Sequence, residues 1–109
     1  MPTTYKILGQ SAPSATTSTD LYTVPSATQA VVSSIVVANR DSAAATFRIS
    51  TAIAGAALAN AQYIAYDVTV GGSDSTIITI GATLGAADKI RVYASTANLT
   101  FTAFGSEIS

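Results

Sequence analysis

The chain has 109 residues, a formal net charge of −1, and 49% hydrophobic against only 10% charged residues. It contains no His, Cys or Trp. This length suits one domain. Without His or Cys, the chain lacks the commonest general bases, thiol nucleophiles and thiolate metal ligands. We therefore predict no enzyme activity, no cofactor and no metal site. The near-neutral charge gives no electrostatic reason to expect binding to nucleic acid or to an anionic membrane.

The N-terminal segment has two parts. Residues 1–6 lack a basic start followed by an apolar run, so we expect no signal peptide. No apolar stretch in the chain approaches the length of a membrane span. Residues 10–19 are small and polar, which is typical of an extended arm. We predict an N-terminal arm over residues 1–20, containing a short strand at Tyr5–Leu8, and a sandwich domain over residues 21–109.

Strand patterns follow along the rest of the chain. A short strand from Leu21 to Val24 is stopped by Pro25, and Val31–Val37 is apolar on both faces, as in a central strand. Later segments combine period-two alternation with β-branched residues. These predicted strands cover residues 46–51, 63–70, 76–80, 89–94 and 99–103.

The connections carry turn residues. Asn39–Ser42 and Ser95–Asn98 separate predicted strands, and the paired glycines of Gly71–Asp74 predict a hairpin in which they supply positive φ. Residues 54–61 have helical propensity but are too few for an independent helix, so we predict a loop or a single turn. About eight short strands at this spacing indicate an all-β fold, an antiparallel β-sandwich of jelly-roll type.

The polar residues favour structural roles. Asp88, in a turn before a strand, is predicted to accept hydrogen bonds from backbone N–H groups. Asp67, Asp74 and Glu107 do not form a calcium-loop pattern and are interpreted as solvated or turn-capping groups. Ser33-Ser34 lacks a companion base, so its hydroxyls are assigned to a strand face. We interpret the scattered cations as solvated or intersubunit ion-pairing groups. They are Arg40, Arg48, Lys89 and Arg91.

Tyrosines are the main candidates for binding. Tyr63 and Tyr93 fall on the polar phase of their strands, where an aromatic ring can pack at the rim, anchor a subunit contact or stack on a sugar. The low charge favours assembly, since small neutral side chains lose little entropy when a neighbour covers them. The candidate interface residues are Tyr5, Leu8, Tyr22, Tyr63 and Tyr93.

Three segments near the N-terminus and one at the C-terminus carry a family resemblance. They are Tyr5–Pro13, Asp20–Pro25, Val31–Asn39 and Ile90–Ile108. Together they resemble small virion structural proteins of tailed bacteriophages, including phages of cyanobacteria. The resemblance runs nearly end to end but contains no mechanistic motif.

The resemblance implies a non-enzymatic structural role. The first expectation is a capsid decoration or cement subunit that bridges capsid subunits as a homo-oligomer, with a trimer favoured and the major capsid protein or another virion protein as partner. Its implied location is the virion, assembled in the host cytoplasm. The N-terminal arm would then augment a neighbour's sheet or lie on the shell. The alternatives are a tail, neck or fibre component, or a carbohydrate-binding attachment module.

Overall fold

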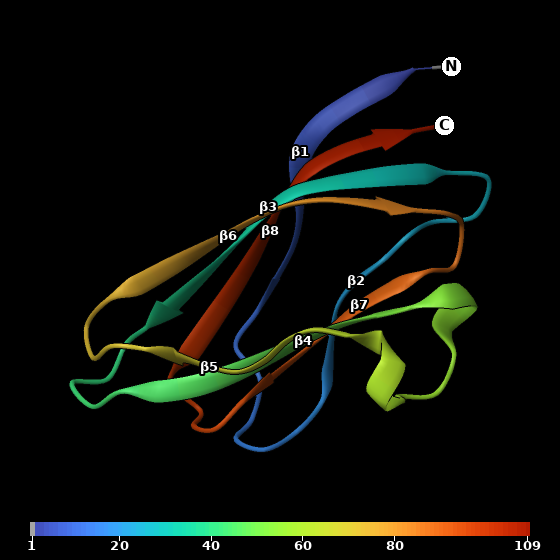
Figure 1. Cartoon of the computed structure of the whole chain (residues 1–109). Coiled ribbons are helices and arrows are strands. Elements are labelled where there is room, and N and C mark those ends of the chain that lie inside the picture. Colours follow the sequence, from blue (N-terminus) through green and yellow to red (C-terminus); the bar gives the residue numbers. More distant parts are fainter. Residues whose placement is uncertain (1) are drawn as a thin grey trace.

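The computed structural model describes residues 2–109 as an all-β chain with two packed antiparallel sheets (Figure 1). We call the sheet with strand order β1-β8-β3-β6 sheet A, and the sheet with order β2-β7-β4-β5 sheet B. The strands are β1 (Thr3–Ser11), β2 (Thr19–Thr23), β3 (Gln29–Asn39), β4 (Ala45–Ala52), β5 (Tyr63–Val70), β6 (Ser75–Leu84), β7 (Lys89–Ala94) and β8 (Leu99–Ile108). Among the described residues, no helix is long and apolar enough to cross a bilayer.

The core lies between the two sheets and is built by the alternation that the sequence shows. In β7, Ile90 and Val92 point inward and are fully or almost fully buried. Phe47 of β4 and Phe101 of β8 meet edge to face at the centre, with ring centroids 6.0 Å apart. Because one residue comes from each sheet, this aromatic pair joins the two layers.

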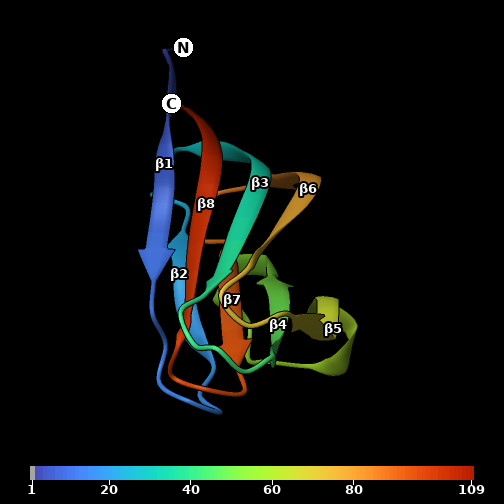
Figure 2. The ribbon, with the colours of Figure 1, turned by 90° about the vertical axis from the view of Figure 1, so that its left-hand side faces the viewer.

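The strands agree with the predicted segments but are often longer. β6 has ten residues where the pattern predicted a strand over 76–80. The alanine-rich segment holds only two short 3₁₀ turns, η1 (Ile53–Gly55) and η2 (Asn60–Gln62), as its short length led us to expect. Figure 2 shows the four strands of sheet A side by side.

The N-terminal segment lies within the chain's own sheets. β1 pairs with β8 from Thr3 to Ser11, well beyond the predicted strand Tyr5–Leu8, and β2 begins at Thr19, inside the predicted arm. A Cβ at Gly9 would overlap the carbonyl oxygen of Leu21. A glycine is therefore needed where β1 approaches β2, and this contact closes one side of the sandwich.

The predicted hairpin at Gly71–Asp74 is wrong: a turn lies there, but β5 and β6 belong to different sheets and do not pair with each other. Its glycines also act differently from the prediction. Neither Gly71 nor Gly72 has a positive φ; Ser73 does, with φ of 52°. A Cβ at Gly72 would overlap the carbonyl oxygen of Ser42. The glycine serves close packing against the β3–β4 loop, where Ser73 N donates to the carbonyl of Asp41 at 2.7 Å.

A transverse line of irregular pairing crosses the middle of sheet A. The register shifts between Ile7 and Gly9 in β1 and between Val32 and Ser34 in β3. The extra residue Ser33 donates from Oγ to the carbonyl of Phe104 at 3.1 Å. Bulges bend strands and increase their twist, and the strands of sheet A change direction at this level in Figure 1.

Candidate functional site

The charged side chains are distributed unevenly over the sandwich. The outer face of sheet B holds Asp20, Arg48, Asp67, Lys89 and Arg91. Lys6 and Glu107 pair at 2.9 Å on the closed β1/β2 side. The others lie in loops and turns, at Arg40, Asp41, Asp74 and Asp88. Within residues 2–109, the outward positions of sheet A therefore carry no charged side chain.

On sheet B, Arg48 is the centre of an aromatic and ionic cluster. Its Nε lies 2.7 Å from Asp67 Oδ1, and its Cζ lies 4.2 Å from the Tyr66 ring centroid and 4.5 Å from that of Tyr93. Tyr63 packs edge to face on Tyr66 at 4.9 Å. The hydrogen bond with Asp67 raises the pKa of Arg48 further, so the guanidinium keeps its charge. Cation–π contacts and an ion pair occupy this cation within the chain itself.

The positive φ of Asp67 explains how the cluster forms. Asp67 has φ of 51° at a register shift, where Phe47 pairs with Val68 but Ile49 pairs with Ala65. The extra residue of β5 turns both Tyr66 and Asp67 toward Arg48. Asp is one of the residues that tolerate this conformation best. The pattern of alternation alone gives no sign of this bulge.

A second ionic cluster lies beside it on the outer face of sheet B. Asp20 accepts hydrogen bonds from Lys89 Nζ at 2.9 Å and Arg91 Nε at 3.3 Å. The hydrogen bond from Lys89, followed by Arg91, holds the pKa of Asp20 below its usual value. Arg91 also donates to the carbonyls of Gly55 and Ala56. The charges of sheet B thus have partners within their own chain.

The outer face of sheet A is apolar and has no such partners. The Tyr5 side chain is 83% exposed, Ile77 65% and Ile7 51%, and Phe104 is also exposed. Hydroxyl-bearing residues of β3, β6 and β8 separate them. Exposed apolar patches of this kind mark surfaces that other molecules cover.

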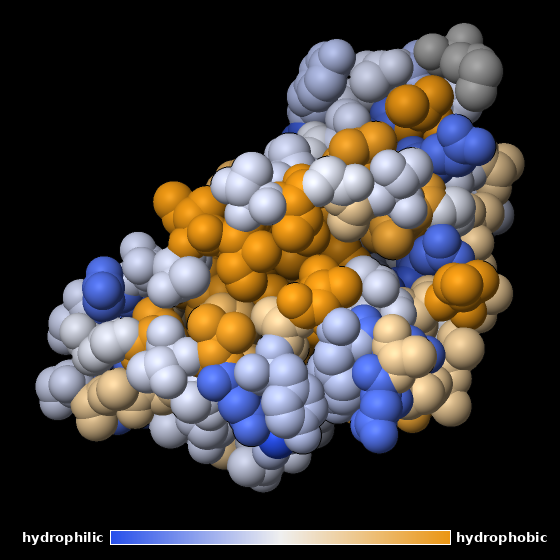
Figure 3. Space-filling model, in the orientation of Figure 1, coloured by the Kyte–Doolittle hydropathy of each residue, from blue (hydrophilic) through white to orange (hydrophobic). Residues whose placement is uncertain are grey.

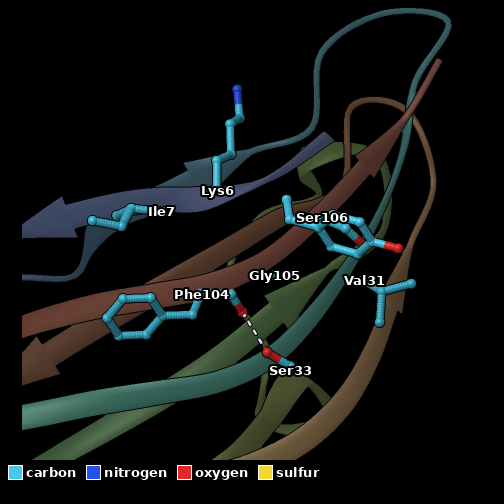
Figure 4. Close-up of a pocket in the computed structure, with 8 residues that line it drawn as sticks. Lys6, Ile7, Val31, Ser33, Phe104, Gly105 and Ser106 are labelled. Carbon is cyan, nitrogen blue, oxygen red and sulfur yellow. Dashed lines mark hydrogen bonds between the residues drawn. The ribbon is translucent and has the colours of Figure 1, made fainter. Parts of the chain in front are cut away.

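A shallow hollow of about 500 Å³ lies at the β1 end of this face. Tyr5, Ile7, Val31 and Phe104 contribute to its lining, and Figure 4 shows Lys6 extending away from Phe104 and Ser33. The hollow offers apolar surface and hydroxyl groups but no acid–base pair. Its chemistry suits an apolar side chain of a partner rather than a reaction.

The five candidate interface residues fall into three different environments. Tyr5 lies on the outer face of sheet A, whereas Tyr63 and Tyr93 lie on the outer face of sheet B. Leu8 packs against the core and Tyr22 is buried. The structure brings Tyr63 and Tyr93 near Arg48 and keeps the other three apart from them. A role of any of the five in an interface stays a prediction.

Tyr22 connects the two sheets through a carboxylate. Its hydroxyl donates to Glu107, and Glu107 also pairs with Lys6. The hydrogen bond from Tyr22, followed by Lys6, lowers the pKa of Glu107, while burial and Glu107 raise the pKa of Tyr22. This buried tyrosine therefore belongs to the closed side of the sandwich.

The remaining carboxylates have local partners. Asp88 accepts from Gly85 N and Ala54 N, both at 2.8 Å, which confirms its predicted role in fixing the turn before β7. Asp74 accepts from Ser75 N at 2.8 Å. Within residues 2–109, no three potential metal-ligating side chains gather in one place.

Sequence reasoning missed several residues of these surfaces. Ile77 and Phe104 are exposed on the outer face of sheet A but are not among the candidate residues, because a strand pattern does not say which face is covered. Figure 3 shows a broad apolar belt across the middle of the molecule.

No protein-family model and no curated protein matches the chain.

Proposed function

We propose that the chain is a non-enzymatic structural subunit of a bacteriophage particle, a decoration or cement protein that bridges capsid subunits as a homo-oligomer. The observation that supports this most is the uncharged outer face of sheet A, which exposes Tyr5, Ile7, Ile77 and Phe104. A rigid sandwich with one such face is suited to being covered by neighbouring subunits. The phage context comes from the family resemblance of the sequence.

We also propose that the sandwich is a jelly roll. The chain passes between the sheets at every connection except the one from β4 to β5, and each sheet alternates strands from the two halves of the chain. In each of the four pairs β1–β8, β3–β6, β2–β7 and β4–β5, the two strands are neighbours in the same sheet. This nested arrangement supports a double Greek key.

The cement mechanism follows from non-covalent bridging. A subunit that contacts two capsid subunits adds binding free energy across their boundary, so the shell resists separation of its parts. This role needs a surface that a neighbouring subunit can cover, and it needs no catalytic residue. The uncharged outer face of sheet A offers such a surface.

Electron cryomicroscopy of particles carrying a tagged copy tests the proposal. A cement subunit should give hundreds of copies of density over the shell. A few copies at one vertex would assign the chain to the tail, neck or fibre instead. Absence of the tagged chain from purified particles would contradict a virion role altogether.

One observation favours a second candidate, carbohydrate attachment. A hollow of about 360 Å³ is lined by Asn60, Tyr63 and Tyr66, which combine an amide with aromatic rings. Arg48 stacks on Tyr66, however, and leaves less ring surface for a sugar. A glycan array with no signal would dispose of this candidate.

A further inference from the structure

One side of the sandwich is open where the other is closed. β5 and β6 are the outermost strands of sheets B and A on this side, and each has a strand neighbour on one side only. Ile64 and Val68 of β5 are 48% and 36% exposed, and Ile80 of β6 is only partly buried. A hollow of about 370 Å³ lies between Ile64 and the 80–84 segment. The apolar belt in Figure 3 follows this open side.

β6 lacks the usual protection of an edge strand. Its ten residues, Ser75–Leu84, include no charged residue and no proline, and six are β-branched Ile or Thr on an unpaired edge. Natural edge strands are normally blunted by charges, prolines or a covering segment, because an open edge recruits other strands. β6 has none of these three in the described chain. Its irregularity is the shift of register with β3 between Thr79 and Ala82, and its free edge can pair with another strand.

We propose that β6 pairs antiparallel with β6 of a second copy of this chain, about a twofold axis at Thr79. This contact deepens the self-assembly proposed above and rests on it. Exposure alternates without a break along β6, with Ile78 and Ile80 turned toward the core. In an antiparallel pair, directly opposed residues share a face. An axis at Thr79 satisfies that rule and sets Ile78 opposite the partner subunit's Ile80.

The same axis matches the shapes of the outward side chains. It sets Ile77, which is 65% exposed, opposite the partner subunit's Gly81. A Cβ built at Gly81 meets nothing within 4 Å, so the position is open in the single chain. The symmetric contact therefore contains this match twice: Ile77 of each copy faces the open position beside Gly81 of the other copy. Because no charge lies on β6, copies of it do not repel each other.

The size of the contact suits a specific interface. Ten residues at about 3.3 Å each give a strand roughly 33 Å long. The two sheets lie about 10 Å apart, and their side chains widen the open side further. Together with the strand length, this width gives the open side an area of roughly 650 Å². Standard protein interfaces bury about 800 Å² per partner. The side is therefore large enough to hold a second copy and to cover the exposed Ile64 and Val68.

Engineered cysteines test the axis directly, since the native chain has none. Thr79→Cys should form a covalent dimer on mild oxidation, because a residue on the axis meets its own copy within disulfide range. Thr4→Cys is the matched control, an exposed threonine on β1, the opposite edge strand of sheet A. Cross-linking of both variants alike, or of neither, would overturn the contact.

A swap of side chains provides the second test. Gly81→Ile places a side chain at the vacant position, where a Cβ meets nothing of its own chain within 4 Å. It should lower dimer affinity at least tenfold in sedimentation, with unchanged circular dichroism. The double variant Ile77→Gly with Gly81→Ile restores the match and should recover the dimer. A wild-type trimer or monomer would overturn the twofold contact. Finding the chain in virions would still support the proposed function, so the two can fail separately.

Discussion

The two outer faces of the sandwich solve the problem of solvent exposure in opposite ways. Sheet B pairs its charges within the chain, as Arg48 does with Asp67 and Asp20 with Lys89. Sheet A has no charged outward side chain in the described residues and exposes large apolar ones such as Tyr5 and Ile77. The charges of sheet B find their partners within a single copy, whereas the apolar side chains of sheet A would lose contact with water if a neighbour covered them. A low charge content is therefore informative mainly through the surface from which the charges are missing.

The largest expected effect comes from the core that supports both faces. Phe47→Ala removes one of the two rings that join the sheets and leaves a cavity, which should lower the free energy of unfolding by about 3–5 kcal/mol. Urea unfolding followed by circular dichroism measures it. We expect both faces to be lost together in one transition. Separate unfolding of the two sheets would contradict a shared core.

A carboxylate placed on either face should have very different effects. Ile7→Glu puts a carboxylate on the uncharged face and should weaken particle binding about 100-fold, because the charge must be desolvated in the contact. Thr46→Glu is the matched control on the outer face of sheet B. Neither should change the fold. Equal losses from the two variants would show that the faces are not functionally different.

Acid should weaken the closed side before it affects the open one. Because the pKa of Glu107 is lowered in the folded state, its ionised carboxylate adds to the free energy of unfolding at pH values above the ordinary carboxyl range. This contribution is lost as the pH falls through the folded-state pKa. Stability should therefore decrease between about pH 5 and pH 2. Glu107→Gln should cost about 1 kcal/mol at neutral pH and reduce the acid dependence. Urea titrations at several pH values measure both, and an unchanged pH slope in Glu107→Gln would contradict this role.

Much of the fold follows from residue patterns. Alternation in β4, β7 and β8 predicts their inward faces, because a strand has a period of two. In β5 the same pattern is wrong for Tyr66, which the bulge at Asp67 turns to the outer face. Asp88 could be assigned from its position before a strand. These predictions depend on local sequence, and the structure agrees with them.

What the sequence could not predict depends on contacts between distant segments. The exposed state of Ile77 and the burial of Tyr22 result from which strands lie at the sheet edges. Gly72 packs against a loop far away in sequence, and Asp67 occupies a bulge whose position depends on β4. Strand pairing within each sheet and packing between distant segments fix the environments of these four residues, and no local pattern records them.

The smallest effect is expected on the charged face, and it tests whether that face is self-contained. Arg48→Met keeps an unbranched apolar stem but removes the ion pair with Asp67 and the cation over Tyr66. Exposed pairs contribute little, so the melting temperature should fall by only a few degrees. Because salt screens exposed charges, the difference from wild type should shrink at about 1 M salt. Assembly should be unaffected, since these partners belong to one chain. If Arg48→Met abolished particle binding while Ile7→Glu did not, the surface that binds the particle would lie on sheet B rather than on sheet A.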